Sequence, residues 1–147
     1  MEAATGTRLP AYVWRLVAQL FWAYDGAARR IHLTVQADAL TLDIDRAAPC
    51  GLILHELFSN ALKHAFPDER PGTIEVALRR AAHQVTLSVR DTGVGFPPAF
   101  DVRRTDSLGL KLVSMLTEQL EGTITLECDG GTTLTLAFPL PLSEMTR

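Results

Sequence analysis

The sequence of 147 residues predicts an α+β two-layer sandwich, in which a mixed, mostly antiparallel sheet carries about three helices on one face. Stretches with apolar residues at helical spacing are interleaved irregularly with stretches that alternate apolar and polar residues. Most neighbouring strand patterns are joined by short, turn-rich connections, which favours antiparallel pairing. The 47% apolar and 21% charged residues fit a single globular domain with a core.

The first segment has no periodic pattern, so residues 1–9 are expected to form a flexible leader. A single domain is then predicted over residues 10–140, followed by a frayed tail at residues 141–147. Residues 11–24 place apolar side chains on one helical face, and Gly26 is typical of the end of such a helix.

Two alternating stretches come next, at residues 31–36 and 40–44, and predict two strands joined by a turn at residues 38–39. Pro49 fits early in a helix but not in its middle. A helix is therefore predicted from near Pro49 to Ala65, and residues 66–72 are rich in turn residues.

The second half predicts two hairpins with a helix between them. The alternating stretches are residues 73–78, 84–89, 123–127 and 132–138. Ser107 is typical of a helix N-cap and Gly122 of a helix end, so the third helix is predicted between them.

Composition narrows the functional class. The net charge is -3 and there is no long basic run, so binding to nucleic acid is not expected. No apolar run is long enough to span a bilayer, and the N-terminus lacks a signal-peptide pattern, so we expect a cytoplasmic domain without direct membrane contact. Trp14 and Trp22 are expected to be packing residues, and Cys50 and Cys128 buried free thiols.

The central helix carries a polar stripe of Glu56, Asn60, Lys63 and His64 on a mostly apolar background. Alone, this stripe could equally be a solvated face. Its chemistry also suits a nucleotide: the Asn60 amide oxygen is a ligand for Mg²⁺ when phosphates supply others. Lys63 offers a point charge for phosphate, and Glu56 a carboxylate that could orient or activate a water on the metal.

Asp91, Gly93 and Gly95 form a second motif directly after a predicted strand. The same pattern marks plain turns. Glycines let the backbone approach a ligand closely, and the Asp91 carboxylate is an acceptor for an exocyclic amine such as that of adenine.

Two further features could complete a nucleotide site. Ser107, Leu108, Gly109 and Leu110 open a helix, whose N-terminal amides can bind phosphate, although a simple N-cap has the same sequence pattern. Thr132 could place a hydroxyl near Asp91, or could be an ordinary threonine of a hairpin. Together the four features provide groups for adenine, metal and phosphates.

These motifs resemble a known family. HELFSNALKHAF resembles the N box of histidine kinases, DTGVGFP their G1 box, SLGLKLV their G2 box and GGTTLTLAFP their closing strand. Over residues 30–140 the chain is thus similar to the catalytic and ATP-binding domain of the GHKL superfamily, which gyrase, Hsp90 and MutL share. The resemblance implies the Bergerat fold, and the His55-Glu56 pair resembles kinases related to the HWE group.

The resemblance implies ATP and Mg²⁺ as cofactors and a role for each helix residue. Asn60 would hold Mg²⁺, Glu56 would support the metal or a water, and Lys63 would contact phosphate. His64 occupies a position where a ring flanks the nucleotide.

The remaining motifs imply the rest of the pocket. Asp91 would accept the adenine amine, with Gly93 and Gly95 shaping the pocket around it. The backbone around Gly109, from Ser107 through Leu108 to Leu110, would meet the phosphates. Thr132 would join the polar network around Asp91. The segment before Gly109 is short for a kinase lid, so phosphate binding could depend on Arg103 or Arg104, although a solvated pair is the simpler expectation.

The implied function is that of a protein-histidine kinase in a two-component system. None of His32, His55, His64 and His83 has the setting of a phosphoacceptor, so the acceptor His is expected on a separate dimerisation domain, with a response regulator downstream. Two alternatives stay open: an anti-sigma-type serine kinase on the same fold, and a degenerate, non-catalytic GHKL binding module.

Overall fold

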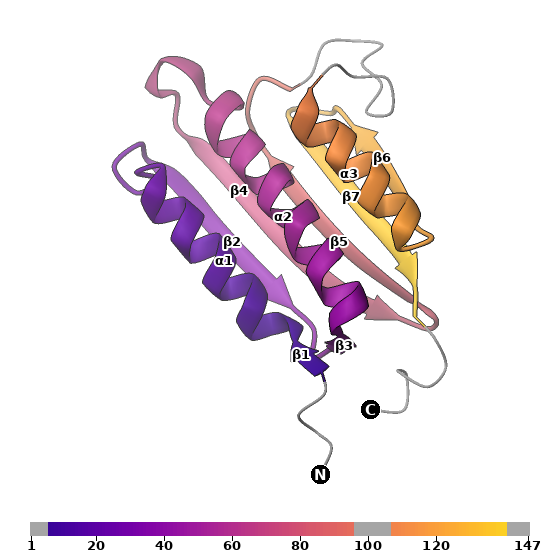
Figure 1. The fold of residues 1–147 in the computed structure, drawn as a ribbon. Coiled ribbons are helices and arrows are strands. Elements are labelled where there is room, and N and C mark those ends of the chain that lie inside the picture. The colour runs from indigo at the N-terminus through magenta and orange to yellow at the C-terminus, as the bar shows by residue number, and fades with distance from the viewer. Residues whose placement is uncertain (1–5, 96–106, 141–147) are drawn as a thin grey trace.

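The structure is a computed structural model that describes residues 6–95 and 107–140. Three helices form one layer over one face of a five-stranded sheet (Figure 1), which confirms the predicted α+β two-layer sandwich. In chain order the elements are β1 (Gly6–Arg8), α1 (Leu9–Ala23), β2 (Ile31–Ala37), β3 (Thr41–Asp43), α2 (Ile44–His64), the 3-10 helix η2 (Pro67–Glu69), β4 (Gly72–Ala81), β5 (Gln84–Asp91), α3 (Leu108–Gln119), β6 (Thr123–Glu127) and β7 (Thr132–Pro139).

The main sheet has the strand order β2-β4-β5-β7-β6. All its neighbours are antiparallel except β2 and β4, which pair in parallel and are connected through α2. This crossover lays α2 across the sheet, since parallel neighbours need a long connection. The register of β5 and β7 places Asp91 directly opposite Thr132, at the end of the sheet that lies near the C-terminal end of α2.

The predicted pairing of residues 31–36 with residues 40–44 through a turn is wrong. β2 joins the main sheet, whereas β3 pairs antiparallel with β1 in a separate two-stranded sheet. The pairing of β3 with β1 also changes the leader predicted at residues 1–9. Gly6–Arg8 form the strand β1, and α1 begins at Leu9. Leu9 and Leu42 are fully buried, so hydrophobic burial draws both segments onto the domain. Residues 1–5 and the predicted tail at residues 141–147 lie outside the described residues.

Helix α2 begins earlier than predicted. It starts at Ile44 rather than near Pro49, and Pro49 lies buried within it. Proline lacks an N–H donor and its ring crowds the carbonyl four residues earlier, so the turn that precedes Pro49 needs other contacts to hold it. An ion pair of 2.9 Å between Arg46 and the N-cap residue Asp43, and Asp45 in the first turn, stabilise this start.

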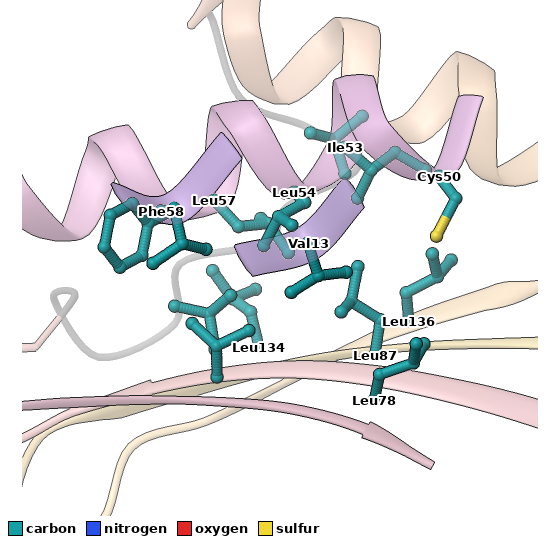
Figure 2. Packing of buried hydrophobic residues seen from close by; sticks show 14 of the residues in the cluster. Val13, Cys50, Ile53, Leu54, Leu57, Phe58, Leu78, Leu87, Leu134 and Leu136 are labelled. Carbon is teal, nitrogen blue, oxygen red and sulfur yellow. The ribbon is translucent and has the colours of Figure 1, made fainter. Parts of the chain in front are cut away.

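The core lies between α2 and the sheet. Figure 2 shows Leu54 and Phe58 of α2 directed toward Leu87 and Leu134 of the sheet, and all four are buried. Val13 of α1 joins the same cluster. Helix α2, central in the helix layer, is therefore held rigidly, and it offers a firm base for the side chains on its other flanks.

Two packing predictions fail in part. Trp14 and Trp22 are 51% and 82% exposed, because α1 lies at the end of the helix layer and has a neighbouring helix on one side only. Cys50 is buried as predicted, and burial raises the pKa of its thiol to about 12. Cys128 is exposed, since it lies in the turn that follows the edge strand β6.

Candidate functional site

A pocket of about 250 Å³ opens between α2 and α3 over the end of the sheet. It brings together seven of the residues that the sequence singled out from four separate segments. These are Asn60, His64, Asp91, Gly95, Ser107, Leu110 and Thr132. The other wall residues are apolar: Leu57, Ala61, Ala65, Val89 and Leu134. A mostly apolar pocket with a few convergent polar groups is typical of a small-molecule site.

The last turns of α2 form one wall. Asn60 and His64 are four residues apart, so both face the pocket on the α3 side. Lys63 does not line it. Because three residues advance the helix by less than one turn, Lys63 points about 60° to the other side of Asn60. Its Nζ lies 5.8 Å from the centre of the Tyr24 ring, at the end of α1.

Asp91 is the buried carboxylate of the pocket, with 7% of its surface exposed. Its Oδ1 accepts a hydrogen bond of 2.9 Å from the Gly93 amide, and the Thr132 amide donates a second bond to the carboxylate. Burial raises the pKa of Asp91 above its ordinary value, and the two backbone hydrogen bonds oppose that rise. A buried carboxylate in apolar surroundings is an acceptor that a neutral amine donor would satisfy.

Glycines hold the backbone close around Asp91. A Cβ on Gly93 would come 2.1 Å from the Ala65 carbonyl oxygen, which also accepts a hydrogen bond of 2.9 Å from the Val94 amide. The loop after β5 is thereby fixed to the end of α2. Gly95, with a φ of +75°, continues the loop along the pocket, in a conformation that L side chains rarely adopt.

The α3 N-terminus closes the opposite side. Ser107 caps the helix as predicted, since its Oγ accepts a hydrogen bond of 3.4 Å from the Leu110 amide. A Cβ on Gly109 would come 2.2 Å from Oε1 of Glu56, so the Glu56 carboxylate lies against the first turn of α3. An anion there is favourable because the helix dipole is positive at this end. The Leu108 side chain is 83% exposed, so only the backbone of Leu108 is placed to contribute to the site.

Sequence reasoning missed the apolar walls and one polar neighbour. Leu57 and Ala61 belong to the apolar background of the central helix, and their spacing from Asn60 places them on the pocket side of α2. The sequence pattern assigns His55 no role in the site, whereas its Nδ1 lies 3.5 Å from Oε2 of Glu56. Arg103 and Arg104 lie outside the described residues.

The donor set limits how a metal could bind. Across residues 6–95 and 107–140 there is no group of three or more His, Cys, Asp or Glu side chains that could hold a metal ion. Asn60 lines the pocket as a single oxygen ligand. A Mg²⁺ ion at Asn60 would therefore need oxygen ligands from a bound phosphate and water, which is how Mg²⁺ commonly binds. In the described part of the chain, every helix is too short or too polar to cross a bilayer.

Comparison with known proteins agrees with this geometry. Residues 45–142 match the family described as "Histidine kinase-, DNA gyrase B-, and HSP90-like ATPase". The chain is 32% identical over 116 residues to the sensor histidine kinase PdtaS of Mycobacterium tuberculosis, covering 76% of this chain and 23% of that protein. It is 31% identical over 137 residues to blue-light-activated histidine kinase 2 of Erythrobacter litoralis, covering 92% and 39%. The chain thus spans well under half of these relatives.

Solved structures show the same arrangement. The histidine kinase domain of the Erythrobacter litoralis EL346 blue-light-activated histidine kinase superposes with a TM-score of 0.86 at 25% identity, over 99% of this chain and 68% of that one. The mycobacterial sensor histidine kinase MprB superposes with a TM-score of 0.73 over 93% and 98% of the two chains. At 18% identity, the second likeness shows the fold alone.

Proposed function

Because this chain belongs to the histidine kinase-, DNA gyrase B-, and HSP90-like ATPase family and is homologous to sensor histidine kinases, we propose that it is the ATP-binding catalytic domain of a two-component sensor histidine kinase. It binds Mg-ATP in the pocket between α2 and α3. It then transfers the γ-phosphoryl group to a histidine on a separate dimerisation and phosphoacceptor domain in the cytoplasm, for onward transfer to a response regulator.

The buried carboxylate of Asp91 carries the adenine part of the proposal. It lies among apolar walls that suit a flat base, and two backbone amides fix its orientation. It accepts a hydrogen bond from the 6-amino group of adenine. Guanine presents an oxygen acceptor at the same place, which would face the carboxylate without a donor. The pocket therefore selects ATP over GTP.

The polar groups at the mouth carry the phosphate part. Asn60 lines the pocket and the first turn of α3 borders it, so the Asn60 amide oxygen and the first amides of α3 would hold Mg²⁺ and phosphate oxygens. Bound Mg²⁺ would neutralise charge on the phosphates. Glu56, held beside the α3 N-terminus, would orient a water or the metal shell from outside the pocket. Positioning and charge neutralisation are the main contributions of a protein to phosphoryl transfer.

The positions of the histidines support a separate acceptor. All four lie in or beside elements of the ATP-binding fold: His32 in β2, His55 and His64 in α2, and His83 in the β4–β5 turn. Their places in the sheet and in the central helix support a phosphoacceptor outside this domain.

Calorimetric titration tests the nucleotide site. We expect a non-hydrolysable ATP analogue to bind in the micromolar range and more tightly with Mg²⁺, and the matching GTP analogue to bind at least tenfold more weakly, or roughly 1.4 kcal/mol. Asn60→Ala should remove the Mg²⁺ dependence and leave metal-free binding nearly unchanged. Equal affinity for the two analogues would contradict the role of Asp91.

A non-catalytic binding module is the second candidate. It is favoured by the position of Lys63 beside Tyr24, which leaves the described pocket wall without lysine or arginine. Incubation with ATP and the phosphoacceptor domain of a related kinase separates the two. Acid-labile phosphohistidine on that domain supports the kinase, and acid-stable phosphoserine on an offered antagonist protein would indicate a serine kinase. Neither product, together with no nucleotide binding in the calorimetric titration, favours the module.

A further inference from the structure

The β4–β5 ladder ends beside the adenine pocket, at the pair formed by Ile74 and Asp91. One residue further along, the Thr92 amide donates a hydrogen bond of 3.1 Å to the carbonyl oxygen of Thr73. In a continued antiparallel ladder, the Thr73 amide would donate back to the carbonyl oxygen of Thr92. Here it donates to the hydroxyl Oγ1 of Thr92, at 2.9 Å. The Thr92 side chain thus takes the place of the Thr92 carbonyl.

This exchange of acceptors affects the peptide unit between Thr92 and Gly93. The carbonyl of Thr92 and the amide of Gly93 belong to one planar unit and point in opposite directions. Because the hydroxyl serves Thr73, the carbonyl is released from the ladder and the unit is free to rotate. The Gly93 amide then donates to Oδ1 of Asp91, at 2.9 Å. Side-chain hydroxyls that compete with backbone acceptors offer a chain this kind of exit from regular structure.

Given the adenine role proposed above for Asp91, on which this inference rests, we propose that Thr92 is a positioning residue of the nucleotide site. Its hydroxyl holds the start of β4 and so keeps the Gly93 amide directed at the carboxylate that accepts the adenine amine. Thr92 is exposed and is not among the described residues that line the pocket, so it acts through its neighbours. Gly72 leaves room for the hydroxyl, because a Cβ there would come 2.8 Å from Oγ1.

The hydrogen bond from Thr73 to the Thr92 hydroxyl lies at the surface, so it contributes more to position than to stability. Water can replace the hydroxyl as the acceptor for the Thr73 amide, and a lost surface contact costs little free energy of unfolding. The Thr132 amide still holds the carboxylate of Asp91 from β7. Loss of the hydroxyl should therefore loosen the carboxylate without unfolding the loop, and it should weaken nucleotide binding less than loss of the carboxylate itself.

Thr92→Val in the full chain tests the proposal, because valine has nearly the same shape but no acceptor. In calorimetry, its affinity for a non-hydrolysable ATP analogue should fall by about 3- to 10-fold, and its preference over the matching GTP analogue should narrow by the same factor. Thr92→Ser keeps the hydroxyl and should retain both. The matched Thr123→Val removes an exposed hydroxyl opposite Ala137, near the end of β7 away from Thr132, and should bind like the wild-type chain. Melting temperatures should agree within about 4 °C.

Amide hydrogen exchange of the nucleotide-free chain separates this proposal from the proposed function. After correction for the neighbouring side chain, the Gly93 amide should exchange about tenfold faster in Thr92→Val than in the wild-type chain, and at the wild-type rate in Thr92→Ser. If the wild-type chain binds nucleotide, either an unchanged affinity or an unchanged Gly93 exchange rate in Thr92→Val overturns the proposal, and so does a Thr92→Ser variant as weak as Thr92→Val. If the wild-type chain does not bind, the proposed function fails, and the exchange rates alone decide whether Thr92 directs the Gly93 amide.

Discussion

Two seams flank the central helix α2, one against α1 and one against α3, and they differ in how they are filled. On the α1 side, Tyr12 packs so close to Gly51 that a Cβ there would come 2.1 Å from the tyrosine hydroxyl. On the α3 side, the helices touch where Glu56 meets Gly109, and a pocket opens beside this contact. One seam is closed by a ring over a glycine, and the other holds space for a ligand.

The difference shows how one helix separates stability from binding. Its α1 and sheet sides are filled with side chains, whereas its α3 side borders a pocket lined by apolar residues and by the polar groups of Asn60, His64 and Asp91. Buried polar groups without full partners are costly, so sites of this kind need a rigid support elsewhere. Substitutions in the two seams should therefore affect different measurements.

The largest effect is expected at the floor of the open seam. Asp91→Asn replaces the acceptor for adenine, and the affinity for an ATP analogue should fall by about 10- to 100-fold, or roughly 1.5–3 kcal/mol. The melting temperature should change little, because Asn removes a buried charge whose ionised form burial disfavours but keeps only one oxygen for the Gly93 and Thr132 amides. Calorimetry and thermal melting measure the two. Asp129→Asn, at an exposed turn, is the control; an Asp91→Asn variant with normal affinity would remove Asp91 from adenine recognition.

A smaller, graded form of this loss is expected on acidification. Because the pKa of Asp91 is raised, its carboxylate takes up a proton above the usual range for aspartate. As pH falls from neutral through that raised pKa, nucleotide affinity should decrease toward the level of Asp91→Asn. The same group contributes stability to the folded state at low pH, and this contribution is lost as pH rises through the folded-state pKa. Titrations of both proteins check this, and a parallel decline in the variant would show that another group titrates.

The same substitution in each seam gives the sharpest contrast. Gly51→Ala must displace the Tyr12 ring and should cost about 1–2 kcal/mol of unfolding free energy. Gly109→Ala meets only the flexible end of Glu56, so stability should change by less than about 0.5 kcal/mol. Its effect should instead appear as weaker nucleotide binding, because the carboxylate leaves the α3 N-terminus. Urea unfolding and calorimetry on both variants provide the test, and equal stability losses would argue against two distinct seams.

The smallest effect is expected at Lys63. Its ammonium lies over the Tyr24 ring, and an exposed pair of this type contributes about 0.5–1 kcal/mol. Lys63→Met should lower stability by no more than that. Nucleotide affinity should change by less than about threefold, or roughly 0.7 kcal/mol. A tenfold loss of affinity, unaffected by Tyr24→Leu, would instead assign Lys63 to the phosphates.

The sequence predicted the layers and most elements because hydrophobic periodicity reports which faces are buried. It did not report which strands are neighbours. Residues 31–36 and 40–44 both alternate, yet only the buried Leu42 and Leu9 explain why β3 pairs with β1. The predicted start of α2 near Pro49 was wrong because the preference of proline for the first turn of a helix is a local rule. Here the Arg46–Asp43 pair and the burial of Pro49 outweigh it.

In the site, helical spacing predicted that Asn60 and His64 share one face of α2, but it could not predict that Lys63 lies away from the pocket. The direction of a long side chain depends on its neighbours, here Tyr24 of α1. Asp91 and Thr132 meet because β5 and β7 are adjacent, which only the sheet order establishes. The exposure of Trp14 and Trp22 could not be predicted from the sequence either, since apolar residues at helical spacing give the same pattern whether or not the fold covers them.

The parallel pairing of β2 with β4 also has a kinetic consequence. β4 and β5 form a local hairpin, but Ile31 can meet Gly72 only after the whole of α2 has been laid across the sheet. Closing so long a loop is slow, and β2 has only one neighbour in its sheet. We therefore expect β2 to join last during folding and to open first. In hydrogen exchange, the amides of β2 should exchange faster than those of β5, and equal protection would show that the domain opens as one unit.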